Sequence, residues 1–147
     1  MENNIQNQIV QFNRMYKAYD DIYQNAAKKF NMPKLALWII YVLRQNSVCT
    51  QKDLVEQLYY PKQSLNSALK SLEEKGYVVL ELSENDRRSK PIRLTEKGIA
   101  FAKDTVDKII QAENDAFAKL DDSERKTLFD LFDRLSSVLR EEMGKVE

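Results

Sequence analysis

Histidine is absent from this chain, and only three glycines occur among its 147 residues. An imidazole general base and a histidine-ligated zinc site are therefore excluded, and three dispersed glycines cannot build a loop that cradles phosphate groups. Among the common catalytic groups, carboxylate chemistry stays open. The sequence thus predicts that the protein is not an enzyme, has no catalytic residues and holds no metal or cofactor.

The chain also has a single cysteine, Cys49, and no long hydrophobic run. One cysteine excludes an internal disulfide framework, and no N-terminal segment combines basic residues with an apolar stretch as a secretory signal does. The longest apolar stretch, residues 35–43, is far shorter than the roughly 20 residues that span a bilayer. We therefore expect a cytoplasmic protein without membrane association.

The formal net charge is zero, which by itself argues against nucleic-acid binding, because phosphate contacts require positive charge. The charge is unevenly distributed, however. Residues 99–147 carry 8 basic and 12 acidic side chains, whereas the short segment 86–97 carries 5 basic and 2 acidic ones. Positive charge is concentrated in the middle of the chain.

Both ends of the chain carry amphipathic stripes. Apolar residues recur from Ile5 to Phe30 at alternating steps of four and three, a pattern typical of a helix that packs on another helix. Residues 121–124 form a capping-box pattern before a second such helix. An intramolecular bundle would cover these stripes, and so would a homodimer interface, which we favour because a small core cannot cover them all. The second stripe comprises Leu128, Leu131, Phe132, Leu135, Val138 and Leu139.

The segments between them predict a winged helix-turn-helix. Pro33 suits the first turn of a helix over residues 34–45, and Thr50 caps a short supporting helix over residues 50–58. A further helix is expected over residues 96–117. We therefore predict a mainly α fold with a small β wing (α+β). Its regions are a dimerisation region formed by residues 1–32 and 118–147, a DNA-binding domain at 33–98 and a connecting helix at 99–117.

The second helix of the motif, from Pro61 to about Lys75, should read DNA. Its inward positions are leucine and alanine, and its acids, Glu73 and Glu74, lie beyond the end that would enter a groove. Side-chain amides suit adenine edges, while lysine and hydroxyl groups suit phosphates or bases, although each residue alone could be an ordinary exposed polar group. The expected major-groove residues are Pro61, Lys62, Gln63, Ser64, Asn66, Ser67 and Lys70.

A strand pair, residues 77–82 and 91–94, should carry the wing between its members. In this loop Asp86 can orient the guanidinium of Arg88, which we expect in the minor groove, with Arg87 and Lys90 at phosphates. A solvated basic turn is the simpler alternative. The expected wing residues are Asp86, Arg87, Arg88, Ser89 and Lys90.

These residues resemble the MarR family of winged-helix transcription regulators along nearly the whole chain. The resemblance is carried by residues 50–54, by residues 62–77, which end in Leu-Glu-Glu-Lys-Gly-Tyr, and by Asp-Arg-Arg at 86–88 followed by residues 92–98. It implies a homodimer that binds a pseudo-palindromic operator in double-stranded DNA and usually represses nearby genes until a ligand or oxidant weakens binding.

The sensor has no clear signature. By similarity, an aromatic effector would bind where the dimer helices meet the winged domain, although plain packing explains the same aromatic residues equally well. Cys49 precedes a helix start that could stabilise its thiolate, but a buried structural cysteine is the better account, because redox-sensing relatives usually carry the cysteine near the N-terminus. The candidate pocket residues are Tyr16, Tyr19, Tyr23, Trp38 and Tyr41.

The sequence as a whole predicts a dimeric, sequence-specific DNA-binding transcription regulator, a repressor released by a small molecule. Two alternatives remain: a winged-helix module that binds another protein instead of DNA, and a redox-sensing regulator acting through Cys49. Steep salt dependence of binding to duplex DNA would distinguish a DNA reader from a protein-binding module.

Overall fold

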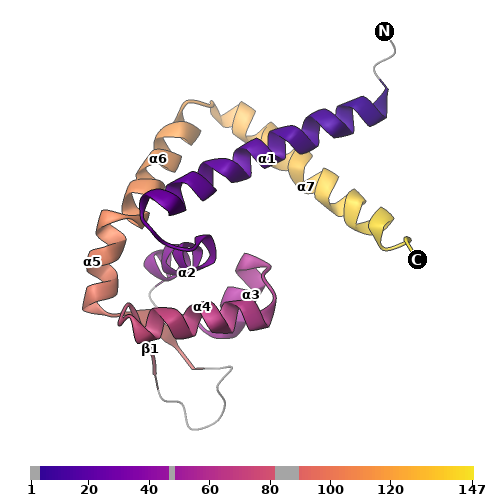
Figure 1. Cartoon of the computed structure of the whole chain (residues 1–147). Coiled ribbons are helices and arrows are strands. Elements are labelled where there is room, and N and C mark those ends of the chain that lie inside the picture. Colours follow the sequence, from indigo (N-terminus) through magenta and orange to yellow (C-terminus); the bar gives the residue numbers. More distant parts are fainter. Residues whose placement is uncertain (1–3, 47–48, 82–89) are drawn as a thin grey trace. The chain divides into compact units, whose positions relative to one another are not determined.

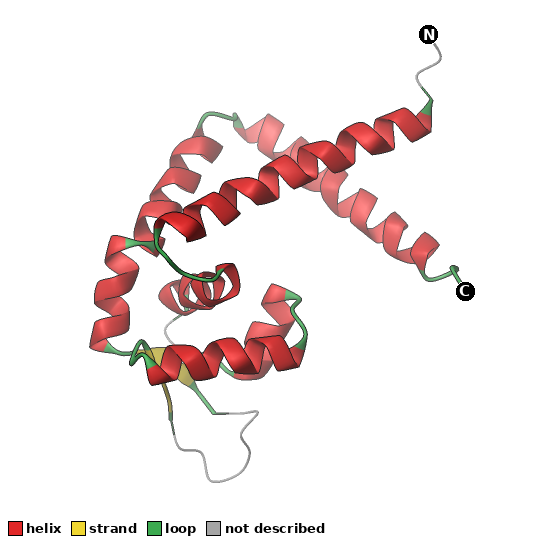
Figure 2. Cartoon of the chain, viewed as in Figure 1, coloured by secondary structure: helices red, strands yellow, loops and turns green. Residues whose placement is uncertain are grey.

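A computed structural model describes residues 4–46, 49–81 and 90–147. Its contacts divide the chain into two compact units, residues 1–109 and 110–147. The helices and β1 are labelled in Figure 1, and all elements are coloured by type in Figure 2. They are α1 (Ile5–Lys29), α2 (Lys34–Gln45), α3 (Gln51–Leu58), α4 (Lys62–Glu74), β1 (Val78–Leu80), β2 (Ile92–Leu94), α5 (Glu96–Asp104), α6 (Val106–Ala118) and α7 (Asp122–Met143).

The core of the first unit forms around α2. This helix is the most apolar of the chain and contacts α1, α3, α4, α5 and β2. Its side chains Ile39 and Ile40 are completely buried. The other fully buried large side chains come from α3, α4, β2 and α6: Leu54, Leu65, Leu72, Ile92 and Val106.

The helix-turn-helix forms as the sequence predicts. Thr50 caps α3 with a reciprocal capping box, in which its hydroxyl accepts from the Asp53 amide and its own amide donates to the Asp53 carboxylate. The helix ends at Leu58, and its C-cap Tyr59 is a non-glycine residue in the left-handed region at φ 55°. Leu54 and Leu65 pack α3 and α4 into the same core.

The strands form a two-stranded antiparallel sheet with Val79 opposite Arg93. Cys49 adds an isolated antiparallel bridge to Ile92, with the Ile92 amide donating to the Cys49 carbonyl over 2.7 Å. The sequence pattern did not predict this bridge, since a single paired residue leaves no alternation to detect. It anchors the segment before α3 to the base of the sheet.

Gly76 and Gly98 hold the junction of α4, β1 and α5. Gly76 adopts φ +80°, as expected for a glycine that ends a helix. Gly98 lies so close to β1 that a Cβ atom there would be 2.0 Å from the Tyr77 carbonyl oxygen. Thr95 caps α5 by accepting from the Gly98 amide and donating its hydroxyl to the Gly76 carbonyl.

The helix expected over residues 96–117 is instead two helices. α5 ends at Asp104, and Thr105 adopts φ −127° and ψ −79°, which breaks the helical path before α6. The buried Thr105 hydroxyl donates to the Phe101 carbonyl over 2.8 Å, a local bond that competes with helical pairing. Because Thr, Val and Ile are tolerated inside helices, the helical spacing of the apolar residues concealed the break.

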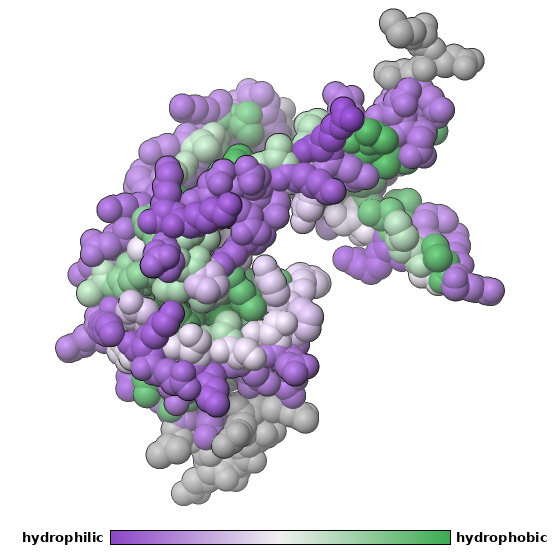
Figure 3. All heavy atoms as spheres, in the orientation of Figure 1, coloured by the Kyte–Doolittle hydropathy of each residue, from purple (hydrophilic) through white to green (hydrophobic). Residues whose placement is uncertain are grey.

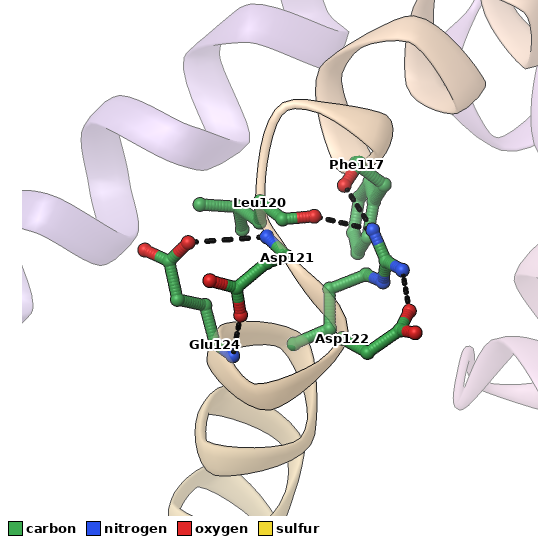
Figure 4. A network of polar contacts seen from close by, with 6 residues as sticks. Phe117, Leu120, Asp121, Asp122 and Glu124 are labelled. Atoms are coloured by element: carbon green, nitrogen blue, oxygen red, sulfur yellow. Dashed lines mark hydrogen bonds and ion pairs between the residues drawn. The ribbon is translucent and has the colours of Figure 1, made fainter.

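In the second unit, a polar network fixes the corner between α6 and α7 (Figure 4). Asp121 and Glu124 form the predicted capping box, in which each side chain accepts from the other residue's amide over 2.8 and 3.1 Å. Arg125 donates to the carbonyl groups of Phe117 and Leu120 and pairs with Asp122. These bonds satisfy the polar groups that helix ends leave unpaired.

Within the described residues, none of the helices is long and apolar enough to cross a membrane. The fold class predicted from the sequence, mainly helical with a small antiparallel wing sheet, is confirmed.

Candidate nucleic-acid interface

The predicted major-groove residues are all exposed, Pro61 as the N-cap of α4 and the others on the helix itself. Leu65, Leu69 and Leu72 are buried and fix the rotation of the helix against the core. The opposite face is therefore turned to solvent. The exposed residues predicted for the major groove are Pro61, Lys62, Gln63, Ser64, Asn66, Ser67 and Lys70.

The start of this helix has no acidic residue in its first turn. Glu73 and Glu74 are exposed at its far end, where they do not oppose a phosphate near the first turns. Ser67 donates its hydroxyl to the Gln63 carbonyl over 3.1 Å, so part of its hydrogen-bonding capacity is used inside the helix. The amides of Gln63 and Asn66 have the donor and acceptor pair that matches a base edge.

The structure describes the base of the wing, and residues 82–89 lie outside the described part of the chain. The predictions for Asp86, Arg87, Arg88 and Ser89 therefore remain predictions. Lys90, the last predicted wing residue, is described and half-buried.

The charges at the wing base are partly paired. Glu81 receives the Arg93 guanidinium over 3.0 Å, and its amide donates to the Pro91 carbonyl over 2.9 Å. Arg93, which contributed to the basic character of segment 86–97, thus has an acidic neighbour in the strand pair.

Four of the five predicted pocket residues form one aromatic cluster. The ring centroids of Tyr19 and Tyr23 are 5.5 Å apart, and Trp38 lies 5.0 Å from both Tyr23 and Tyr41. Tyr16 is 55% exposed, and no ring contact joins it to this cluster among the described residues. These edge and tilted contacts are those that stabilise aromatic packing.

The cavity beside this cluster is small. It is lined by Tyr23, Lys34, Leu37, Trp38, Tyr41 and Ile109 and holds about 10 Å³, room for about one water molecule. The Lys34 ammonium, which the sequence pattern did not single out, pairs with Asp20 beside this space. In this conformation the packed aromatic rings leave no room for a small-molecule ligand in the cavity.

Cys49 is 3% exposed, and burial raises the pKa of its thiol to about 11, with the nearby Asp53 charge adding to the effect. Both effects oppose the stabilised thiolate that the start of a helix could provide. The structure agrees with the alternative, a buried structural cysteine.

The region 30–89 matches the sequence model described as "MarR family". An HTH-type transcriptional regulator of Bacillus subtilis, YwhA, is 26% identical over 99 residues, which cover 67% of this chain and 71% of the relative. A MarR family regulator from Neisseria meningitidis has a similar structure, with a TM-score of 0.84, 23% identity and coverage of 94% of this chain and 97% of the other.

Staphylococcus aureus MarR, solved with salicylate and kanamycin, has a TM-score of 0.70 and 19% identity, and the match covers 93% of each chain. These structural similarities support the winged-helix fold. The matched proteins are transcription regulators and not enzymes, in agreement with the prediction from the sequence.

Proposed function

We propose that this chain, which belongs to the MarR family of transcription regulators, acts in the cytoplasm as a homodimer that binds an inverted-repeat operator and represses nearby genes until a small molecule releases it. The observation that carries the proposal is the start of α4, which is exposed and has no acidic residue in its first turn. Buried leucines on the other side of the helix hold it against the core. A helix presented in this way fits the major groove of duplex DNA.

In this proposal Gln63 and Asn66 read base edges, and Lys62 and Lys70 hold phosphates. Pro61, Ser64 and Ser67 complete the contact surface. The wing would place Arg88, oriented by Asp86, in the adjacent minor groove, with the phosphates held by Arg87 and Lys90. Ser89 would be the remaining wing residue.

The second copy would be bound through residues 1–32 and 118–147, with residues 99–117 connecting them to the DNA-binding domain at 33–98. Large apolar side chains are exposed on α1 and on α7 (Figure 3). None of the described residues of α7 is buried. Isolated soluble proteins rarely expose apolar surface on this scale. The exposed apolar residues of α7 include Leu128, Leu131, Phe132, Leu135, Val138 and Leu139, each 44–58% exposed.

The effector would be a small aromatic molecule in the cluster around Trp38. A relative of similar fold was solved with salicylate, which supports this ligand class. Because the cavity here holds only about 10 Å³, the residues that line it must move apart before such a ligand can enter. Phenylalanine is substituted singly for each of the four tyrosines, Tyr16, Tyr19, Tyr23 and Tyr41. If none of these variants changed ligand-induced DNA release, a hydroxyl-lined pocket would be excluded.

Selection of duplexes from a randomised DNA pool, followed by sequencing, tests the proposal directly. A two-fold symmetric motif with half-sites about one helical turn apart is expected. The affinity of the protein for this motif should fall steeply as the salt concentration rises, and the Arg88→Ala variant should bind the motif more weakly than the wild type.

Recovery of no motif, with only weak salt-sensitive retention, would support the alternative that the winged domain binds another protein. The zero net charge of the chain favours that alternative. Redox regulation through Cys49 is not proposed, since its buried thiol has a pKa of about 11.

A further inference from the structure

The start of α6 is the point at which the connecting helix leaves the winged domain. α5 ends at Asp104, Thr105 departs from the helical path, and α6 begins at Val106. Val106 is completely buried, and Asp107 follows it in the first turn of α6. From there the helix continues to Ala118 without a further break. The contacts of this first turn therefore control the direction of α6.

The first turn of α6 is held on α2 by a two-point ion pair. The Nε and Nη2 atoms of Arg44 donate to the two carboxylate oxygens of Asp107, each over 2.9 Å. A single bond would leave the carboxylate free to swing, whereas two parallel bonds from a planar guanidinium fix its orientation as well as its distance. Ile109 adds an apolar contact surface, because it lines the small cavity together with Trp38 of α2.

α2 is in turn fixed to the helix that we propose for the major groove. It contacts both α3 and α4. Ile39 and Ile40 of α2 and Leu65 of α4 are completely buried in the core that these helices share. Because such a core is closely packed, it resists sliding of one helix on another. A tilt of α6 on α2 is therefore also a tilt relative to α4.

Small tilts of α6 are large on the scale of DNA. A helix of 13 residues is about 20 Å long, at a rise of about 1.5 Å per residue. A tilt of about 10° at its first turn would move its far end by about 3 Å, close to the roughly 3.4 Å between successive base pairs. A dimeric helix-turn-helix protein binds half-sites whose separation matches that of its two major-groove helices. Discrimination of one base pair in spacing thus requires the direction of α6 to be restrained.

We propose that the pair of Arg44 and Asp107 determines which half-site spacing the dimer accepts. The inference rests on the proposed function, because it requires a homodimer on an inverted repeat. Both are positioning residues, which act through α6 and do not touch DNA. Their side chains are 30% and 35% exposed, so solvent limits what the pair adds to stability. Its two-point geometry is explained better by the need to orient α6.

A series of operators with altered spacing tests the role of the pair. Base pairs are inserted or deleted between the half-sites of the operator obtained by selection, and fluorescence anisotropy measures the affinity of the full-length protein. The wild type should bind about tenfold more weakly when the spacing changes by one base pair, because one half-site no longer matches its helix. For Arg44→Gln and for Asp107→Asn this penalty should fall to about threefold or less, because α6 can then tilt to follow the half-sites.

Two further variants separate geometry from charge. Arg44→Lys keeps the positive charge but cannot form two parallel bonds, so its spacing preference should be as relaxed as that of Arg44→Gln. Asp115→Asn is the matched control, because it removes the same charge from α6, where the exposed Asp115 accepts from Gln111 of the same helix over 2.9 Å. It should keep the spacing preference of the wild type.

A merely structural role of the pair would lower the affinity for every operator by the same factor, because unfolded protein binds none of them. Equal spacing penalties for the wild type, Arg44→Gln and Asp107→Asn would therefore overturn the inference and leave the proposed function intact. A wild type that bound a two-fold motif at every spacing equally well would do the same. If the wild type selected no two-fold motif, the proposed function itself would fail, and this inference with it.

Discussion

Arg44 at the end of α2 holds Asp107 at the start of α6 by two parallel hydrogen bonds. Its Nε atom donates to one carboxylate oxygen and its Nη2 atom to the other, each over 2.9 Å. This planar, two-point geometry is specific to arginine, which cannot be replaced by lysine without losing one bond. The pair fixes the direction of the chain immediately after the break at Thr105.

Breaking this pair should destabilise the protein by about 1 kcal/mol, because the side chains are about one-third exposed (30% and 35%) and solvent weakens their attraction. Asp107→Asn and Arg44→Gln should each show the loss in urea unfolding. The double variant should lose much less than the sum of the two, since the same bonds are removed. Independent, additive losses would show that the pair does not act as a unit.

The same pair predicts a pH dependence. The Arg44 hydrogen bonds lower the pKa of Asp107 below its ordinary value of 3.8. Its stabilising contribution is therefore fully present above the unfolded-state pKa and is lost as pH falls through the lower folded-state pKa. The stability difference between wild type and Asp107→Asn should be constant from pH 7 to about pH 5 and should shrink below about pH 4. A difference that grew on acidification would have the wrong sign.

Gly98→Ala should destabilise the winged domain by about 2–4 kcal/mol, because the new Cβ atom would lie 2.0 Å from the Tyr77 carbonyl oxygen and the backbone would have to move. Thermal unfolding measures the loss. Gly144→Ala is the control, because its Cβ would meet nothing closer than 3.3 Å at the end of α7. Equal melting temperatures for the two variants would contradict the close approach of α5 to β1.

The thiol of Cys49 should be almost unreactive in the folded protein. With a pKa of about 11 and an exposed fraction of 3%, very little accessible thiolate exists at pH 8. Labelling with Ellman's reagent should be slow in buffer and fast in urea. Cys49→Ser treated with peroxide should keep the same DNA affinity as treated wild type, and a selective loss in the wild type would restore the redox hypothesis.

Leu131→Asp on α7 should dissociate the proposed dimer, because it would place a charge in the middle of the apolar face. Leu131 is 58% exposed in the single chain. Sedimentation velocity should show the protein shifting from dimer to monomer. Ser137→Asp introduces the same charge on the opposite side of α7 and should leave the dimer unchanged. A monomeric wild type would rule out the interface itself.

The sequence by itself determined those features that depend on neighbouring residues. Helix limits follow from caps such as Thr50 and Asp121, and the buried side of α4 follows from leucines at helical spacing. Because side chains on one helix face the same direction every three to four residues, the exposed face of α4 could be derived before any coordinates. The pairing of β1 with β2 was expected for another reason, because two short strand-like segments flank a polar loop.

Only the tertiary structure decided the features that depend on residues distant in the chain. The pairing of Arg44 with Asp107 and the bridge of Cys49 to Ile92 each join separate segments. Burial in the folded chain likewise raises the pKa of the Cys49 thiol to about 11, in line with the structural cysteine that the sequence favoured. Periodicity fixes which face a helix presents, whereas packing fixes what each side chain meets there.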